Sequence, residues 1–159
     1  MHMNLQSGLS AGLLALLCVG GWCALIGLIA RLSGWHALAE RYPSDERIEG
    51  ELFRFASMSV GPKWFPSHYG GCLFVRLADD GVRLSILFPF RMGHPPLFIP
   101  WHAVEDCRQE RFWFATYTTV QLVEPKMPMT FSGKLGRALL DAWSKRGRGP
   151  ALAKQGDFW

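Results

Sequence analysis

Three histidines and two cysteines between positions 68 and 107 have side chains that can ligate a metal ion. They are His68, His94, His102, Cys72 and Cys107. Imidazole and thiolate ligands together favour zinc, but structural zinc sites usually keep their ligands in close pairs such as Cys-x-x-Cys. No such pair occurs in the chain. We therefore interpret these residues as polar loop histidines and buried thiols, and we expect no metal ion.

His102 is followed by two carboxylates, Glu105 and Asp106, and these side chains are the candidates for acid–base catalysis. That chemistry needs a group held in a cleft with a shifted pKa. Adjacent strand residues point to opposite faces, so only His102 and Asp106 can share a face. Glycine-rich phosphate loops and the His-Glu-x-x-His and Gly-x-Ser-x-Gly motifs are also absent from the sequence. We expect a non-enzymatic protein without a cofactor, with a small enzyme centred on His102 as an alternative.

The length and charge of the chain limit its architecture and its partners. Its 159 residues hold one ordinary domain and one appendage, because a domain takes about 100–150 residues. The 17 Lys and Arg against 13 Asp and Glu make the chain mildly basic. Nucleic-acid binding requires a much denser basic surface, so we expect no nucleic acid as partner.

Residues 8–30 form an uncharged apolar run near the amino terminus. As a helix, these 23 residues reach about 34 Å, enough to cross the ~30 Å hydrocarbon core of a bilayer. A buried soluble helix would show a polar stripe, and a cleaved signal peptide would have a basic start and a shorter apolar region. We therefore assign residues 1–32 to a retained transmembrane signal-anchor helix.

Basic residues flank this run on one side only, because Arg31, Arg41 and Arg47 follow it and no Lys or Arg precedes it. Positive charges near a span stay in the cytoplasm. The sequence therefore predicts a single-pass protein with its amino terminus outside and its carboxyl-terminal domain in the cytoplasm.

Small residues mark one side of the apolar run, where another helix can approach closely. The alternative is that glycines are simply common in membrane spans. The possible helix-packing positions are Gly8, Gly12, Gly20 and Ala24.

Residues 33–46 read as a short amphipathic juxtamembrane helix followed by a polar linker. Ser33 is placed as an N-cap, and Pro43 stops the helix. Trp35 and Tyr42 share its apolar face, which fits either the headgroup level of a bilayer or packing on the domain beneath. We name Arg31, Trp35 and Tyr42 as membrane-interface residues.

Short β-type runs separated by Gly, Pro and Asp fill residues 47–146. We predict a strand over 51–60, an irregular loop over 61–71, a hairpin over 72–88 about Asp79-Asp80-Gly81, two strands over 111–124 with a turn near Thr116 to Thr118, and a short last strand over 128–131. The fold class is α+β, in which a small antiparallel β-barrel or sandwich follows the span.

The segment before position 104 contains three prolines, Pro95, Pro96 and Pro100, which exclude a helix. Proline cannot donate to a β-ladder, so an edge position is expected. We predict a bent edge strand continuing through Val104. Its residues Leu97, Phe98, Ile99, Pro100 and Trp101 could accept a strand from a partner.

An amphipathic helix from about Ser132 to Arg146 ends the domain, with Leu135, Leu139 and Trp143 in its apolar stripe. A flexible basic tail, 147–159, follows. Lys145, Arg146 and Arg148 could contact anionic lipid, and a solvated helix face with a solubilising tail is the alternative.

Three sequence segments carry a resemblance to known bacterial proteins: "DDGVRLS", "HPPLFIPWHAVEDC" and "SGWHALAERYP". The first two, followed by two strands and a helix, resemble the pleckstrin-homology-like domains of bacterial membrane proteins. The third resembles a segment of uncharacterised small bacterial proteins with one amino-terminal span. The resemblance covers residues 8–145 and implies a fold, a single span and an inner-membrane location, but no active-site residue.

We expect a membrane-anchored interaction module, an accessory subunit of a bacterial membrane protein complex. Its partners would be the bilayer, as an integral single-span protein, and another membrane protein. The alternative function is an anionic-lipid-sensing module at the membrane surface.

Overall fold

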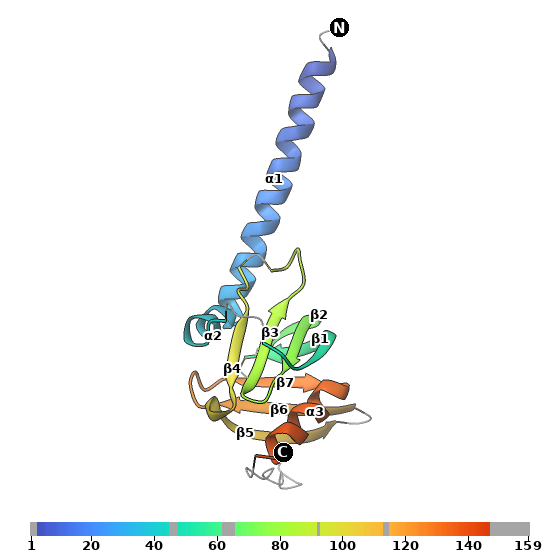
Figure 1. Cartoon of the computed structure of the whole chain (residues 1–159). Helices are drawn as coiled ribbons and strands as arrows, with labels where there is room; N and C mark the ends of the chain where they lie inside the picture. The colour runs from blue at the N-terminus through green and yellow to red at the C-terminus, as the bar shows by residue number, and fades with distance from the viewer. Residues whose placement is uncertain (1–2, 45–47, 62–65, 92, 113–114, 147–159) are drawn as a thin grey trace.

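The computed structural model describes residues 3–44, 48–61, 66–91, 93–112 and 115–146 (Figure 1). Helices α1 (Met3–Leu32) and α2 (Trp35–Arg41) come first, and helix α3 (Gly133–Ser144) comes last. The strands between them are β1 (Glu51–Val60), β2 (Ser67–Leu77), β3 (Gly81–Ile86), β4 (Leu97–Pro100), β5 (Val104–Phe112), β6 (Ala115–Leu122) and β7 (Pro128–Ser132).

The strands form one antiparallel sheet in the order β4-β3-β2-β1-β7-β6-β5. Its two edge strands, β4 and β5, are consecutive in the chain, joined only by a 3-10 turn over Trp101–Ala103. This short connection brings the two edges together at one end, so the sheet curls into a half-barrel (Figure 1). The predicted antiparallel β-unit with a carboxyl-terminal helix is confirmed at this level.

The core lies inside the curl, where alternate residues of each strand point inward. In β3, Val82, Leu84 and Ile86 are buried, and Arg83 and Ser85 face outward. Helix α3 covers the β5–β7 side. Its buried residues are Leu135, Gly136, Leu139 and Trp143.

Helix α1 extends away from the sheet as a single long rod (Figure 1). Its segment Ser10–Leu32 is long and apolar enough to cross a membrane, with a mean hydropathy of 2.5. Most of its described side chains are exposed, but Ile26 and Ala30 near its end are buried. The predicted apolar helix is confirmed, and its insertion in a bilayer stays a prediction.

A two-residue elbow joins α1 to α2. Gly34 precedes α2 in the left-handed conformation, with φ of 80°, which glycine adopts without strain. The Ser33 hydroxyl donates to Ala30 O at 3.1 Å, and it also accepts a bond from the Trp35 backbone N–H at 3.4 Å. The cap position therefore belongs to Gly34, and Ser33 fixes the elbow instead of acting as the predicted N-cap.

Two predicted segments before residue 105 differ from the structure. The predicted loop over 61–71 is wrong in its second half, because β2 begins at Ser67 and pairs with Val60 of β1. Cross-strand pairing outweighs the weak strand tendency of Gly70 and Gly71. The predicted bent strand through Val104 is also wrong, because it breaks at the 3-10 turn after Pro100, and Val104 begins β5 on the other edge of the sheet.

The predicted turn near Thr116 to Thr118 is wrong as well, because these residues lie inside β6. Thr118 is buried and lies on the same face of β6 as the buried Val120 and Leu122, so residues 115–122 form one continuous strand. The connection between β5 and β6 falls at residues 113–114, outside the described residues. The predicted tail over 147–159 also lies outside them.

Candidate functional site

A buried cluster joins the long helix to the sheet. We call Ser33, Trp35, Tyr69 and His94 the junction cluster. The Ser33 hydroxyl lies 2.6 Å from the Tyr69 hydroxyl, which lies 3.2 Å from His94 Nε2. The Trp35 ring packs on Tyr69 and His94 with centroid distances of 5.4 and 5.5 Å. Four separate elements therefore meet here: the elbow, α2, β2 and the loop between β3 and β4.

The junction cluster is closed to solvent. Trp35 is fully buried, and its indole N–H donates to Pro95 O at 3.0 Å. Burial raises the pKa of the Tyr69 phenol, although the hydrogen bond with Ser33 acts in the opposite direction. Aromatic packing combined with buried hydrogen bonds favours one arrangement of neighbours. The cluster therefore attaches the domain to α1 at a defined angle.

This burial changes the interpretation of the predicted membrane-interface residues. Trp35 and Tyr42 belong to the hydrophobic core of the domain, so their side chains do not face a bilayer. The apolar face of α2 therefore packs on the domain, as in the second of the two possibilities given by the sequence, and not at the headgroup level of a bilayer. Arg31 is exposed at the end of α1, and its place at a membrane interface stays a prediction.

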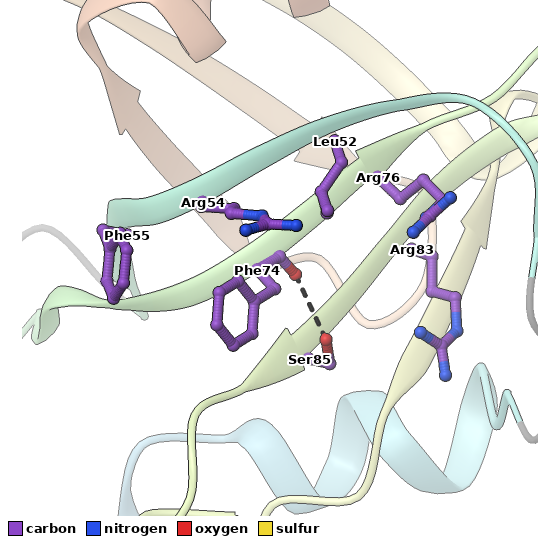
Figure 2. Close-up of a pocket in the computed structure, with 7 residues that line it drawn as sticks. All are labelled: Leu52, Arg54, Phe55, Phe74, Arg76, Arg83 and Ser85. Atoms are coloured by element: carbon purple, nitrogen blue, oxygen red, sulfur yellow. Dashed lines mark hydrogen bonds between the residues drawn. The ribbon is translucent and has the colours of Figure 1, made fainter.

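A second feature lies on the outer surface of β1, β2 and β3. A hollow of about 340 Å³ is bordered by three arginines, three apolar side chains and one serine, which we call the arginine face. Figure 2 shows how these side chains come from three neighbouring strands. They are Arg54, Arg76, Arg83, Leu52, Phe55, Phe74 and Ser85.

A β-bulge in β1 builds one side of the arginine face. The pairing of β1 with β2 shifts between Phe53 and Ala56, and Phe55 has φ of 54°. The left-handed conformation is unfavourable for a phenylalanine, by about 1–3 kcal/mol. Because of the bulge, Arg54 and the adjacent Phe55 are both exposed, and the Phe55 ring packs on Phe74 at 5.8 Å.

The arginine face concentrates positive charge. Arg76 of β2 stands directly opposite Arg83 of β3, and like charges in cross-strand pairs are destabilising. Arg83 Nε donates to the Ser44 hydroxyl at 3.2 Å. Within the described part of the chain, Arg54 and Arg76 form no ion pair. Guanidinium groups beside aromatic rings fit a ligand that carries both carboxylate and apolar groups.

Two comparisons with known proteins give no indication of the function of this chain. No family model matches the chain, and no curated protein matches it either.

The arginine face continues towards the end of the domain that carries α1. A second hollow of about 360 Å³ shares Phe74, Arg83 and Ser85 with the first and extends to Phe88 and Arg91. The loop that holds Phe88 and Arg91 rises beside α1 (Figure 1). The two hollows therefore adjoin, and the second reaches from the arginine face to the loop between β3 and β4.

The predicted partner edge strand is indeed an edge of the sheet, but little of it is free. Leu97 and Ile99 are buried in the core, and Trp101 is buried in the 3-10 turn. Pro43 bridges to Leu97, and the Phe98 N–H donates to Tyr42 O at 3.0 Å. The segment after α2 thus occupies the outer side of β4. Strand addition at Phe98 and Pro100 stays a prediction.

The predicted helix-packing residues lie along the exposed part of α1. A Cβ added at Gly12 or Gly20 would meet no atom within 4 Å, so the surface there is open. Ala24 borders a hollow at the base of α1, and the surroundings of Gly8 lie outside the described side chains. Packing against a partner helix stays a prediction.

The predicted lipid contacts Lys145 and Arg146 lie at the end of the domain opposite to α1 (Figure 1), and their contact with lipid stays a prediction. Lys145 and Arg146 follow α3, and Figure 1 places the end of α3 opposite to α1. The Arg146 guanidinium stacks 4.6 Å above the Trp101 ring and donates to Ala142 O and Asp79 O. Arg148 lies outside the described residues.

The five metal-type residues are dispersed. His94 is buried in the junction cluster, and His102 is exposed in the 3-10 turn. Cys107 is buried in the core, where burial, with a smaller contribution from Asp106, raises its pKa to about 12. Burial also raises the pKa of Cys72. Within the described ranges, no three metal-ligating side chains gather at one place.

One further hollow was not anticipated from the sequence. It is bordered by residues of β1, β2, β5, β6 and β7, with a volume of about 700 Å³, and holds Ser59 with its hydroxyl 3.0 Å from His68 Nδ1. The two residues are direct partners across β1 and β2. A nucleophile–base pair also needs a third group that orients the ring, and no described carboxylate bonds to His68. Only the strand register could have revealed this pair.

Proposed function

We propose that the chain is a membrane-anchored, non-enzymatic interaction module, an accessory subunit of a bacterial membrane protein complex, which binds an acidic segment of its partner on the arginine face. One observation carries the proposal: Arg76 and Arg83 stand opposite each other on an open sheet surface. A partner carboxylate could bind Arg76 there, because arginine–carboxylate pairs form strong, directional hydrogen bonds.

The apolar residues of the arginine face narrow the class of partner. Phe55 is well exposed, and Leu52 and Phe74 lie beside it. A purely acidic chain would leave these groups uncovered, whereas a segment with alternating acidic and apolar residues would cover both kinds of side chain. Because the adjoining hollow reaches the β3–β4 loop, which contacts α1, the segment of a membrane-protein partner that lies close to the bilayer fits best.

Further support comes from the architecture. We propose that the domain is pleckstrin-homology-like, because a curled antiparallel sheet followed by a carboxyl-terminal helix agrees with that resemblance. We also propose that α1 anchors it in the inner membrane with the domain in the cytoplasm, in accord with the basic residues that follow the helix.

A second candidate function, anionic-lipid sensing, is favoured by a hollow at the base of α1. It has a volume of about 520 Å³ and is bordered by Ala24, Leu28, Arg31 and His36, among others. Apolar helix residues on one side and a cation on the other suit a lipid headgroup with its first acyl carbons. This site is an alternative to the one predicted at Lys145 and Arg146.

The proposed function can be tested with a fluorescent peptide of alternating glutamate and phenylalanine and the full chain in detergent. Fluorescence anisotropy should show saturable binding that weakens as salt is added. Arg76→Ala should weaken it about 10- to 100-fold, because a hydrogen bond to a charged group contributes roughly 1.5–3 kcal/mol.

Arg108→Ala is the matched control, because Arg108 lies on β5 and is paired with Asp106 at 2.9 Å. Equal weakening by both variants would mean that only net charge matters, which contradicts the proposal. Equal binding of a lysine–phenylalanine peptide would contradict it too. Binding to anionic vesicles that Arg31→Gln abolishes, with no peptide binding, would favour the lipid-sensing alternative.

A further inference from the structure

The loop between β3 and β4 stands against the lower part of α1 instead of folding back on the sheet (Figure 1). The Phe90 ring packs on Trp22 of α1 with a centroid distance of 6.0 Å. Gly93, with φ of 80°, lies so close that an added Cβ would be 3.1 Å from Gly27 Cα and 3.7 Å from Ala30 Cβ. The loop therefore covers one side of the helix between Trp22 and Ala30.

The other sides of α1 at this height are apolar and uncovered. Leu25 is 50% exposed, Leu28 53% and Ile29 45%. If α1 spans a bilayer, the acyl chains must reach at least to Ile29 to cover them. Trp22 lies seven residues closer to the amino terminus, about 10 Å deeper at 1.5 Å per residue.

The length of α1 leads independently to the same conclusion about the depth of Trp22 in the bilayer. If the acyl region ended above the loop, the apolar segment from Ser10 would be left with about 12 residues, roughly 18 Å of helix, to cross a core of ~30 Å. Such a helix is too short. The bilayer must therefore surround α1 at the height where Phe90 contacts Trp22.

The amino-acid composition of the β3–β4 loop suits a position in the acyl region of the bilayer. Phe88 is 76% exposed, more than any other large apolar side chain in the described part of the chain, and Phe90 is 39% exposed. Arg91 is exposed beside them, and its long side chain can extend to the phosphate layer while its stem stays in apolar surroundings.

From these observations we infer that the β3–β4 loop inserts Phe88 and Phe90 into the acyl region of the bilayer that α1 crosses. The domain then has two membrane contacts, the span and the loop. This inference rests on the proposed anchoring by α1. It commits to lipid as the occupant because the apolar surface of the loop is continuous with that of the helix.

Depth-dependent quenching of an environment-sensitive dye tests the inference. The full chain, with its four cysteines replaced by alanine, carries a single new cysteine at Phe88, at Leu17 in α1, or at Gln109 in β5. Each protein is labelled and reconstituted in phosphatidylcholine–phosphatidylglycerol vesicles that contain lipid spin-labelled on the acyl chain or on the headgroup. Phe88 is a surface position, so the label should not disturb folding.

The inference predicts that the dye at residue 88 emits at shorter wavelength than the dye at residue 109 and is quenched more strongly by the acyl label than by the headgroup label. Iodide in the aqueous phase should quench residue 109 but hardly residue 88. If residue 17 is quenched by the acyl label and residue 88 only by iodide, the loop does not insert, although the anchor stands. If neither residue is quenched by lipid, the proposed anchoring itself fails.

Discussion

The junction cluster and the arginine face belong to the same domain but use their polar groups in opposite ways. In the junction cluster, every ring is buried and the Tyr69 hydroxyl lies within bonding distance of partners from two other elements. On the arginine face, like charges stand opposite each other and the Phe55 ring remains exposed. The arrangement in the junction cluster stabilises the fold, whereas exposed rings and like charges that face each other do not. This contrast supports the proposal that a ligand binds at the arginine face.

The largest effect should come from truncating the ring at the centre of the junction cluster. Trp35→Ala should lower the free energy of unfolding by about 3–5 kcal/mol, the usual cost of removing a large buried aromatic side chain. Urea denaturation followed by circular dichroism in detergent measures it. His36→Ala changes the exposed neighbour on α2 and is the control. If the two variants lose the same stability, the junction cluster does not hold the domain together.

A smaller effect is expected from removing one hydroxyl group of the same cluster. Tyr69→Phe keeps the ring but removes the oxygen that contacts Ser33 and His94, which should cost about 1–3 kcal/mol. Thermal unfolding measured at pH 7 gives this difference. An unchanged melting temperature would show that the hydrogen bonds contribute nothing.

The same variant has a pH signature. Burial raises the pKa of Tyr69 above its ordinary value of 10.0. The phenol then stays protonated in the folded state while it ionises in the unfolded chain, so its contribution is complete below pH 10 and falls as the pH rises further. Tyr69→Phe should therefore lose less stability between pH 10 and 11 than the unmodified chain, apart from the contribution of Tyr42.

The smallest effect on stability should be on the arginine face. Arg76→Ala removes one of two like charges and should change the free energy of unfolding by less than about 0.5 kcal/mol, in either direction. The same change should cause the largest loss of acidic-peptide binding. A strongly destabilised Arg76→Ala protein with normal binding would reverse the comparison between the two regions.

Much of the fold was predictable because local patterns and tertiary structure agree. The alternation in Val82, Leu84 and Ile86 and the Asp-Gly turn before them predict the β2–β3 hairpin. The apolar stripe Leu135, Leu139 and Trp143 predicts α3. In each case, residues close in sequence carry the whole signal.

The errors arise where long-range contacts decide. The sequence leaves open what covers Trp35, and the answer depends on Tyr69 and His94, which are far away in the chain. The prolines indicate a bend before Val104, but only the closing of the half-barrel sends the chain to the opposite edge of the sheet.

The arginine face illustrates the limit for the candidate site. Arg76 and Arg83 lie in a predicted hairpin, so their pairing was accessible from the turn position. Arg54 and Phe55 join them only through the bulge in β1, which no local pattern marks. The contacts between the β3–β4 loop and α1 were equally hidden, because they depend on how the helix stands on the sheet.

Our central claim is that the junction cluster holds the sheet on α1 in one orientation. Double electron–electron resonance between spin labels tests it directly, with labels introduced as Leu17→Cys in α1 and Gln109→Cys in β5 in the full chain in vesicles. Cys18, Cys23 and Cys72 are replaced by serine, whereas Cys107 can remain because its buried thiol, with a pKa of about 12, should not react. We predict one narrow distance distribution that broadens when Trp35→Ala is added. A broad distribution in the protein that retains Trp35 would contradict the account.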